Sequence, residues 1–218
     1  MPLLSEFNVL ECKFAFRDLS PFLRRHSNIT HFSLTRSSLI GPIMPLADFL
    51  PHLEVISANP DYLLGLLSRG RHLFPRLRSV SLTEFSVRAI QHKSLDNVLQ
   101  NLADRKRGTI HLSITFWQPN DLTECFSRAK SKPYSLDCVK TLEIIRFGFP
   151  SSSEMCDSFF SWVSGVFPYV QELDLTQMVP PHLNMWTWRS DALWDSCPEL
   201  RSIIVGVDTY QRPAKAVQ

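Results

Sequence analysis

Apolar residues recur along this chain in one repeated phrase. The phrase is clearest in residues 167–175 (FPYVQELDL), where an apolar–Pro entry precedes apolar residues at spacings i, i+3 and i+5. Residues 74–82 and 197–205 repeat it, and residues 50–56 hold a looser copy. Apolar and polar residues that alternate over so short a stretch are typical of a β-strand with one buried face. Each copy of the phrase therefore predicts one strand.

Alignment of the phrase gives eight expected strands, each identified by its first apolar position. These positions are Phe7, Ile29, Leu53, Leu77, Thr109, Val139, Val170 and Leu200. Thr109 is included because residues 110–116 alternate cleanly, although the leading apolar residue is missing there. Neighbouring copies lie 22 to 32 residues apart. Leucine-rich repeats have a similar period, roughly 20–29 residues, with one strand and one return in each unit.

The segments between the expected strands read mostly as helices. We expect Ser20 and Asn59 to be N-caps, because a proline follows each of them at the first helical position. Apolar residues at helical spacing in residues 95–102 predict another helix. A capping-box pattern in residues 151–154 precedes a fourth. Residues 41–46 contain two prolines and predict an irregular return.

A strand followed repeatedly by a helix implies parallel strands joined by right-handed crossovers. The sequence therefore predicts an α/β protein with strands on one face and helices on the other. We expect a leucine-rich-repeat-like solenoid, similar in type to ribonuclease inhibitor, with about seven to eight irregular repeats. Residues 1–210 are expected to form a single array, and residues 211–218 a C-terminal tail.

Composition indicates the class of protein and its cellular compartment, but it does not identify a partner. Hydrophobic residues make up 44% of the chain and charged residues 20%, as in ordinary folded proteins. The five cysteines are scattered, with no C-x-x-C pair, which favours reduced thiols in the cytoplasm or nucleus. The chain shows neither a signal peptide nor an apolar run long enough for a membrane span. A net charge of +2 does not itself imply a nucleic-acid or membrane partner.

Alternate residues of each expected strand should face away from the helices, on a concave surface. The candidate partner-binding residues there are His31, Ser33, Ser57, Ser79, Ser81, His111, Ser113, Glu143, Glu172 and Asp174. On the first strand, Val9, Glu11 and Lys13 are expected to face outward as well. One hypothesis is a docking groove for a protein or peptide, with an acidic patch in its later strands. The alternative is a polar sheet face that only keeps the protein soluble and resists edge pairing.

Other candidate residues give weaker signals. Trp186, Trp188 and Trp194 suit a binding hot spot but also suit core packing, which we favour. Basic clusters such as Arg76 with Arg78 lie at helix ends and loops, so nucleic-acid binding is the least favoured function. The histidines and cysteines match no zinc pattern, and no nucleophile elbow occurs. We therefore expect a protein that has no catalytic site and binds neither a metal ion nor a cofactor.

The repeated strand phrase, together with residues 18–26 (DLSPFLRRH) and 56–64 (ISANPDYLL), resembles fungal F-box/leucine-rich-repeat proteins. The resemblance implies the substrate-recognition repeats of a ubiquitin-ligase subunit, with a protein target on the concave face. An F-box is a helical segment that usually precedes the repeats, and a first strand at Phe7 leaves no room for it. We thus expect a Skp-type adaptor as partner only if an F-box exists outside this chain. The alternative is a standalone or degenerate repeat scaffold without a link to a ligase.

Overall fold

The fold is given by a computed structural model of the chain. It describes residues 4–67, 74–85, 89–104, 108–116, 134–146, 153–176 and 190–213.

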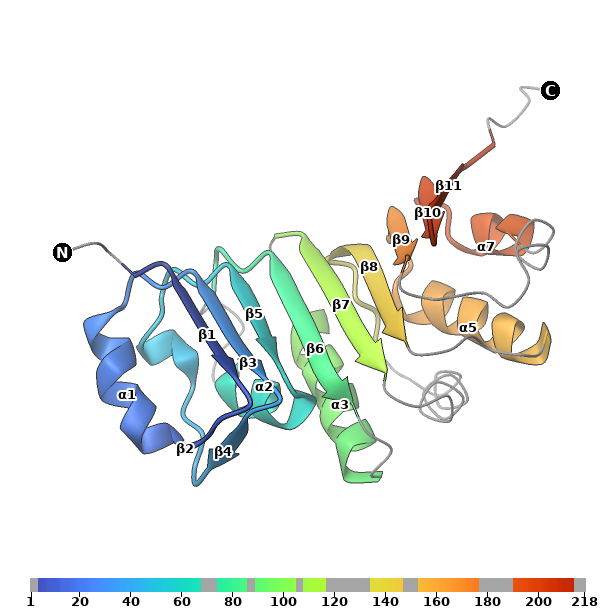
Figure 1. Cartoon of the computed structure of the whole chain (residues 1–218). Coiled ribbons are helices and arrows are strands. Elements are labelled where there is room, and N and C mark those ends of the chain that lie inside the picture. The colour runs from blue at the N-terminus through green and yellow to red at the C-terminus, as the bar shows by residue number, and fades with distance from the viewer. Residues whose placement is uncertain are drawn as a thin grey trace.

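A nine-stranded sheet runs through the described part of the chain, with its strands in sequence order (Figure 1). The strands are β1 (Glu6–Leu10), β3 (His31–Thr35), β5 (Val55–Ala58), β6 (Ser79–Phe85), β7 (Ile110–Phe116), β8 (Val139–Arg146), β9 (Glu172–Leu175), β10 (Ser202–Val205) and β11 (Asp208–Gln211). The first eight pair in parallel, and β11 pairs antiparallel with β10. The predicted α/β class with mostly parallel strands is therefore confirmed.

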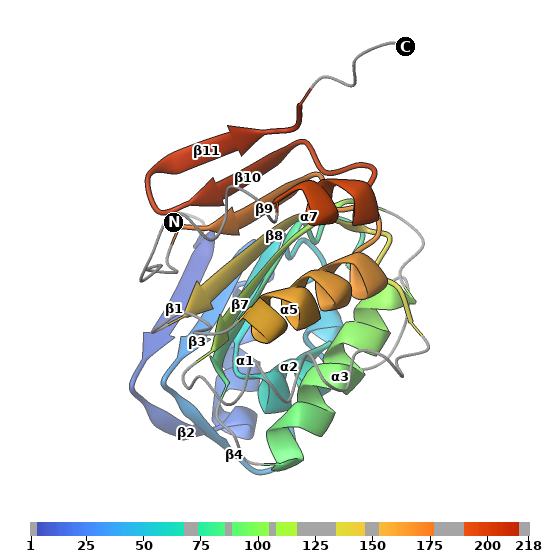
Figure 2. The same ribbon diagram turned by 90° about the vertical axis from the view of Figure 1, so that its right-hand side faces the viewer.

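Helices and short elements connect these strands. They are α1 (Phe16–Arg25), the 3-10 turn η1 (Leu46–Asp48), α2 (Pro60–Leu66), α3 (Ala89–Ala103), α5 (Ser153–Val166) and α7 (Ser190–Ser196). Two short strands, β2 (Lys13–Ala15) and β4 (Ser38–Ile40), form a separate parallel pair. Helices α2, α3, α5 and α7 lie on one side of the nine-stranded sheet (Figure 2). The return between β3 and β5 is irregular, as its prolines predicted.

The core lies between the sheet and the helices, in two apolar rows that cross the strands. The first apolar row contains Phe7, Phe32, Ile56, Val80, Leu112, Leu142, Leu173 and Ile203. The second contains Val9, Leu34, Ala58, Leu82, Ile114, Ile144, Leu175 and Val205. From β3 to β10 each of these side chains is buried, whereas Phe7 and Val9 are only partly buried. Each unit thus buries its apolar face against its neighbours.

The helix starts were predicted with mixed success. Asn59 is the N-cap of α2, as expected, and its side chain accepts a hydrogen bond from the Asp61 N–H at 2.9 Å. Ser20 is not a cap: it lies inside α1, and its hydroxyl donates to the Arg17 carbonyl at 3.0 Å. Helix α1 begins at Phe16 because this fully buried residue starts its apolar stripe. The apolar residues of the stripe in 95–102 are buried in α3, as predicted.

The first strand was predicted in the wrong register. Phe7 lies opposite Phe32, three positions beyond the Ile29 with which the phrase aligned it. Side chains in a strand alternate between faces, so an odd shift exchanges the two faces. Val9 therefore faces the helices rather than the outside. The other two outward expectations also fail on β1, since Glu11 follows that strand and Lys13 begins β2.

Candidate interaction surface

The sheet face opposite the helices carries two polar rows that follow the strand register. The first polar row contains Glu6, His31, Val55, Ser79, His111, Thr141, Glu172 and Ser202. The second contains Asn8, Ser33, Ser57, Ser81, Ser113, Glu143, Asp174 and Ile204. Neighbouring positions in a row are about 4.8 Å apart, the ordinary spacing of paired strands. No described helix covers this face, which we call the open face (Figures 1 and 2).

All ten candidate residues lie in these two rows, so the register brings together residues that are far apart in sequence. Nine of them are partly or fully exposed. Ser113 is the exception, because its side chain is only 4% exposed. Its short side chain has Glu143 beside it in the row and His111 and Thr115 on its own strand. Ser113 was expected at the surface, and it is instead part of the floor beneath longer side chains.

Hydroxyl groups dominate the middle of the open face. Ser33, Ser57, Ser81 and Ser113 hold consecutive positions of the second polar row. Ser33, Ser57 and Ser81 are partly exposed, and a serine hydroxyl can both donate and accept a hydrogen bond. Chemically, this part of the face can form hydrogen bonds to an extended chain or a polar surface.

Carboxylates gather where the two rows cross β8 and β9. Glu143 lies opposite Asp174 in the second polar row, and Glu172 lies opposite Thr141 in the first. On the adjoining strand β7, His111 Nε2 lies 3.7 Å from the nearer carboxylate oxygen of Glu143. The predicted acidic patch is therefore present as a group of three carboxylates on neighbouring strands, with a histidine at its border.

The contact between His111 and Glu143 shifts the pKa of both groups. Contact with Glu143 raises the pKa of His111 above its ordinary value of 6.5 and outweighs partial burial, which acts against it. The charges of Asp174 and Glu172 add to that increase. The same contact lowers the pKa of Glu143 below its ordinary value of 4.5. Both side chains are partly exposed, with 47% of the His111 side chain and 25% of the Glu143 side chain accessible, so solvent screens the pair.

The contact between His111 and Glu143 was not predicted from the sequence. Both residues were expected on the concave surface, without a contact between them. The signal was present, however, because His111 belongs to the first polar row and Glu143 to the second, on consecutive strands. Such diagonal neighbours lie close enough for long side chains to meet.

The remaining candidate residues add little to this surface. Trp194 is 5% exposed and packs in the core, as favoured, whereas Trp186 and Trp188 lie outside the described residues. Arg78 forms an ion pair of 3.0 Å with Glu54.

Among the described residues, no group of three or more His, Cys, Asp or Glu side chains is placed to hold a metal ion. No helix in that part of the chain combines the length and apolar character needed to cross a membrane.

No model of a protein family matches the chain, and no curated protein matches it in sequence. The fold and surface define an α/β protein with a mostly parallel sheet, one face of which is largely polar and carries no helix among the described residues.

Proposed function

We propose that this chain is a non-enzymatic protein–protein interaction module, and that its open face binds a protein or peptide target. The observation that carries the proposal is the register of the strands. It places residues from eight strands, from Glu6 in β1 to Ile204 in β10, side by side in two rows. Both rows are polar except at Val55 and Ile204. A largely polar surface on a packed sheet suits recognition of an extended partner more than chemistry on a small molecule.

The order of the elements supports a finer proposal. Eight parallel strands in sequence order, each packed on its neighbours through the same two apolar rows, are what a leucine-rich-repeat-like solenoid requires. Together with the resemblance in residues 18–26 and 56–64, this favours the substrate-recognition repeats of an F-box ubiquitin-ligase subunit. A standalone scaffold is the alternative, and it shares the docking surface but not the adaptor.

Proximity labelling in cells tests the docking surface. The variant Glu143→Lys with Asp174→Lys reverses the sign of the acidic patch. The control variant, Glu199→Lys with Asp195→Lys, makes the same charge change at exposed positions in and just after α7. We expect the first variant to lose part of the wild-type partner set and the control to retain it. An unchanged partner set in a folded first variant would refute the docking surface.

The link to a ligase is tested separately, with the product of the complete open reading frame. Affinity purification should recover a Skp-type adaptor if the repeats belong to an F-box protein. Recovery of targets without an adaptor would leave the interaction module standing and remove the ligase assignment.

A further inference from the structure

The outer edge of β1 has no strand partner among the described residues, because β1 is the first strand in the order of the sheet. The Ser5 carbonyl accepts a hydrogen bond from the His31 N–H at 3.1 Å, and the Glu11 N–H donates to the Thr35 carbonyl at 3.0 Å. Backbone groups of successive strand residues point to opposite edges, so the odd-numbered residues of β1 face β3. The even-numbered residues face the outer edge: Glu6, Asn8 and Leu10.

These outward backbone groups can form hydrogen bonds to an added strand. The Leu10 carbonyl accepts a weak bond from the Cys12 thiol at 3.3 Å. The N–H and C=O groups of Glu6 and Asn8 and the N–H of Leu10 remain directed at the free edge. An edge of this kind is a template for pairing with another chain.

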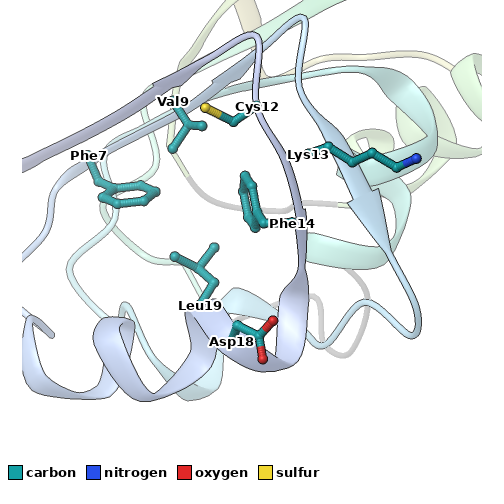
Figure 3. A pocket seen from close by; sticks show the side chains of 7 residues that line it. All are labelled: Phe7, Val9, Cys12, Lys13, Phe14, Asp18 and Leu19. Carbon is teal, nitrogen blue, oxygen red and sulfur yellow. The ribbon is translucent and has the colours of Figure 1, made fainter.

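An apolar pocket adjoins the same edge, between β1, β2 and α1 (Figure 3). Its volume is about 410 Å³, within the roughly 300–1,000 Å³ of ligand pockets. The side chains of Phe7, Val9, Phe14 and Leu19 border the space, whereas the Lys13 side chain extends away from it. At the rim, the Asp18 carboxylate lies 3.6 Å from its neighbour Arg17. The pocket therefore suits neutral, apolar side chains.

The rest of the sheet indicates what chemistry fits this pocket. Each internal strand contributes two apolar side chains, separated by one residue, and each of the two belongs to one of the apolar rows. Within the sheet, Phe7 and Val9 have strand neighbours on the β3 side only, Phe32 and Leu34, and the rings of Phe7 and Phe32 are stacked at 5.6 Å. From the helix layer, the ring of Phe22 in α1 packs against Phe7 at 5.1 Å. Their other side faces the pocket, so they are partly buried where their row partners are fully buried. A strand added at the edge would complete both rows.

We propose that the outer edge of β1 and the adjoining pocket bind an extended peptide segment of a partner protein, with two apolar residues separated by one residue. The segment adds to the sheet as a further parallel strand. Its backbone pairs with Glu6, Asn8 and Leu10, and its two apolar side chains enter the pocket beside Phe7 and Val9. This site uses the backbone edge of β1 and the pocket on its helix side, whereas the side chains of Glu6 and Asn8 belong to the adjoining open face. It does not depend on the function proposed for that face.

Fluorescence anisotropy with a labelled synthetic peptide tests the proposal. The probe is Thr-Lys-Thr-Val-Thr-Leu-Lys-Thr, in which Val and Leu supply the apolar pair, and the control peptide carries Asp at both positions. On the protein, Asn8→Pro removes an N–H that faces the free edge and leaves the bonds to β3 in place. Asn8→Ala is the matched control, since it changes the side chain and keeps the N–H. We expect saturable binding of the probe only, weakened about tenfold or more by Asn8→Pro and less than about twofold by Asn8→Ala.

Hydrogen exchange on the wild-type protein gives a second readout that does not depend on how Asn8→Pro folds. Amide protection on adding the probe should fall within residues 4–14. Any of three results would overturn the proposal: the two peptides bind equally, the two Asn8 variants have equal effects, or protection appears at another edge such as β11. Self-association that Asn8→Pro abolishes, without binding of the probe, would also overturn it and assign the edge to a second copy of this chain.

Discussion

Gly65 in α2 offers a test of the packing because two opposing effects act on one substitution. Gly65 lies in the last turn of α2, where alanine is more favourable than glycine by about 0.5 kcal/mol. A Cβ at position 65, however, would lie 2.9 Å from Cγ2 and 3.0 Å from Cβ of Ile43. Rotation about χ1 of Ile43 does not move its own Cβ, so backbone must shift. Overpacking of this kind costs about 1–3 kcal/mol. We therefore expect Gly65→Ala to lower the free energy of unfolding by about 1 kcal/mol.

A second helical glycine provides the matched control. Gly165 lies in the last turn of α5, and a Cβ there would meet no other atom within 4 Å. Only the helix-propensity effect remains, so Gly165→Ala should raise the free energy of unfolding by about 0.5 kcal/mol. The same chemical change thus has opposite signs at the two positions.

A double-mutant cycle assigns the cost to the contact itself. Ile43→Gly removes both the Cγ2 atom at 2.9 Å and the Cβ atom at 3.0 Å, so the combined variant should be less destabilised than the sum of the two single variants, by about 1 kcal/mol. Urea-induced unfolding followed by circular dichroism measures all four free energies. Additive effects, or stabilisation by Gly65→Ala, would show that the irregular return between β4 and β5 does not pack on α2 as described.

Two further predictions concern ionisable side chains. Because the pKa of His111 is raised, this histidine stabilises the fold below pH 6.5, and the stabilisation is lost as the pH rises through its folded-state pKa. Because the pKa of Glu143 is lowered, this carboxylate stabilises the fold above pH 4.5. Glu143→Gln should therefore lower the His111 pKa in an NMR titration and destabilise the protein more at pH 5.5 than at pH 9; equal destabilisation at both values would contradict this. Burial raises the pKa of the Cys197 thiol to about 11, so iodoacetamide at pH 8 should alkylate exposed Cys12 and leave Cys197 unmodified in the native protein, as mass spectrometry would show.

The interior of the sheet could be predicted from sequence because each internal strand has apolar residues at every position that the helices bury. In β7 the alternation alone was sufficient: Ile110, Leu112, Ile114 and Phe116 are all buried, although the strand lacks the apolar–Pro entry. Once the face of each strand is known, the two polar rows follow. Contacts between rows were harder to predict, since the distance between His111 and Glu143 depends on register between strands about 30 residues apart in sequence.

The ends of the sheet could not be predicted in the same way, and the reason is physical. An internal strand has neighbours on both sides that bury its inward residues, whereas β1 has one. Its inward Val9 is only partly buried and its outward Leu10 is apolar yet 63% exposed, so the pattern does not distinguish the faces.

At the other end, β11 has no apolar stripe and is held by pairing with β10. Directly after it, the guanidinium of Arg212 donates to the Trp194 carbonyl at 2.7 Å and the Leu200 carbonyl at 3.3 Å. No local pattern encodes such contacts. The sequence signal therefore weakens where burial is one-sided, as it is at both ends of the described sheet.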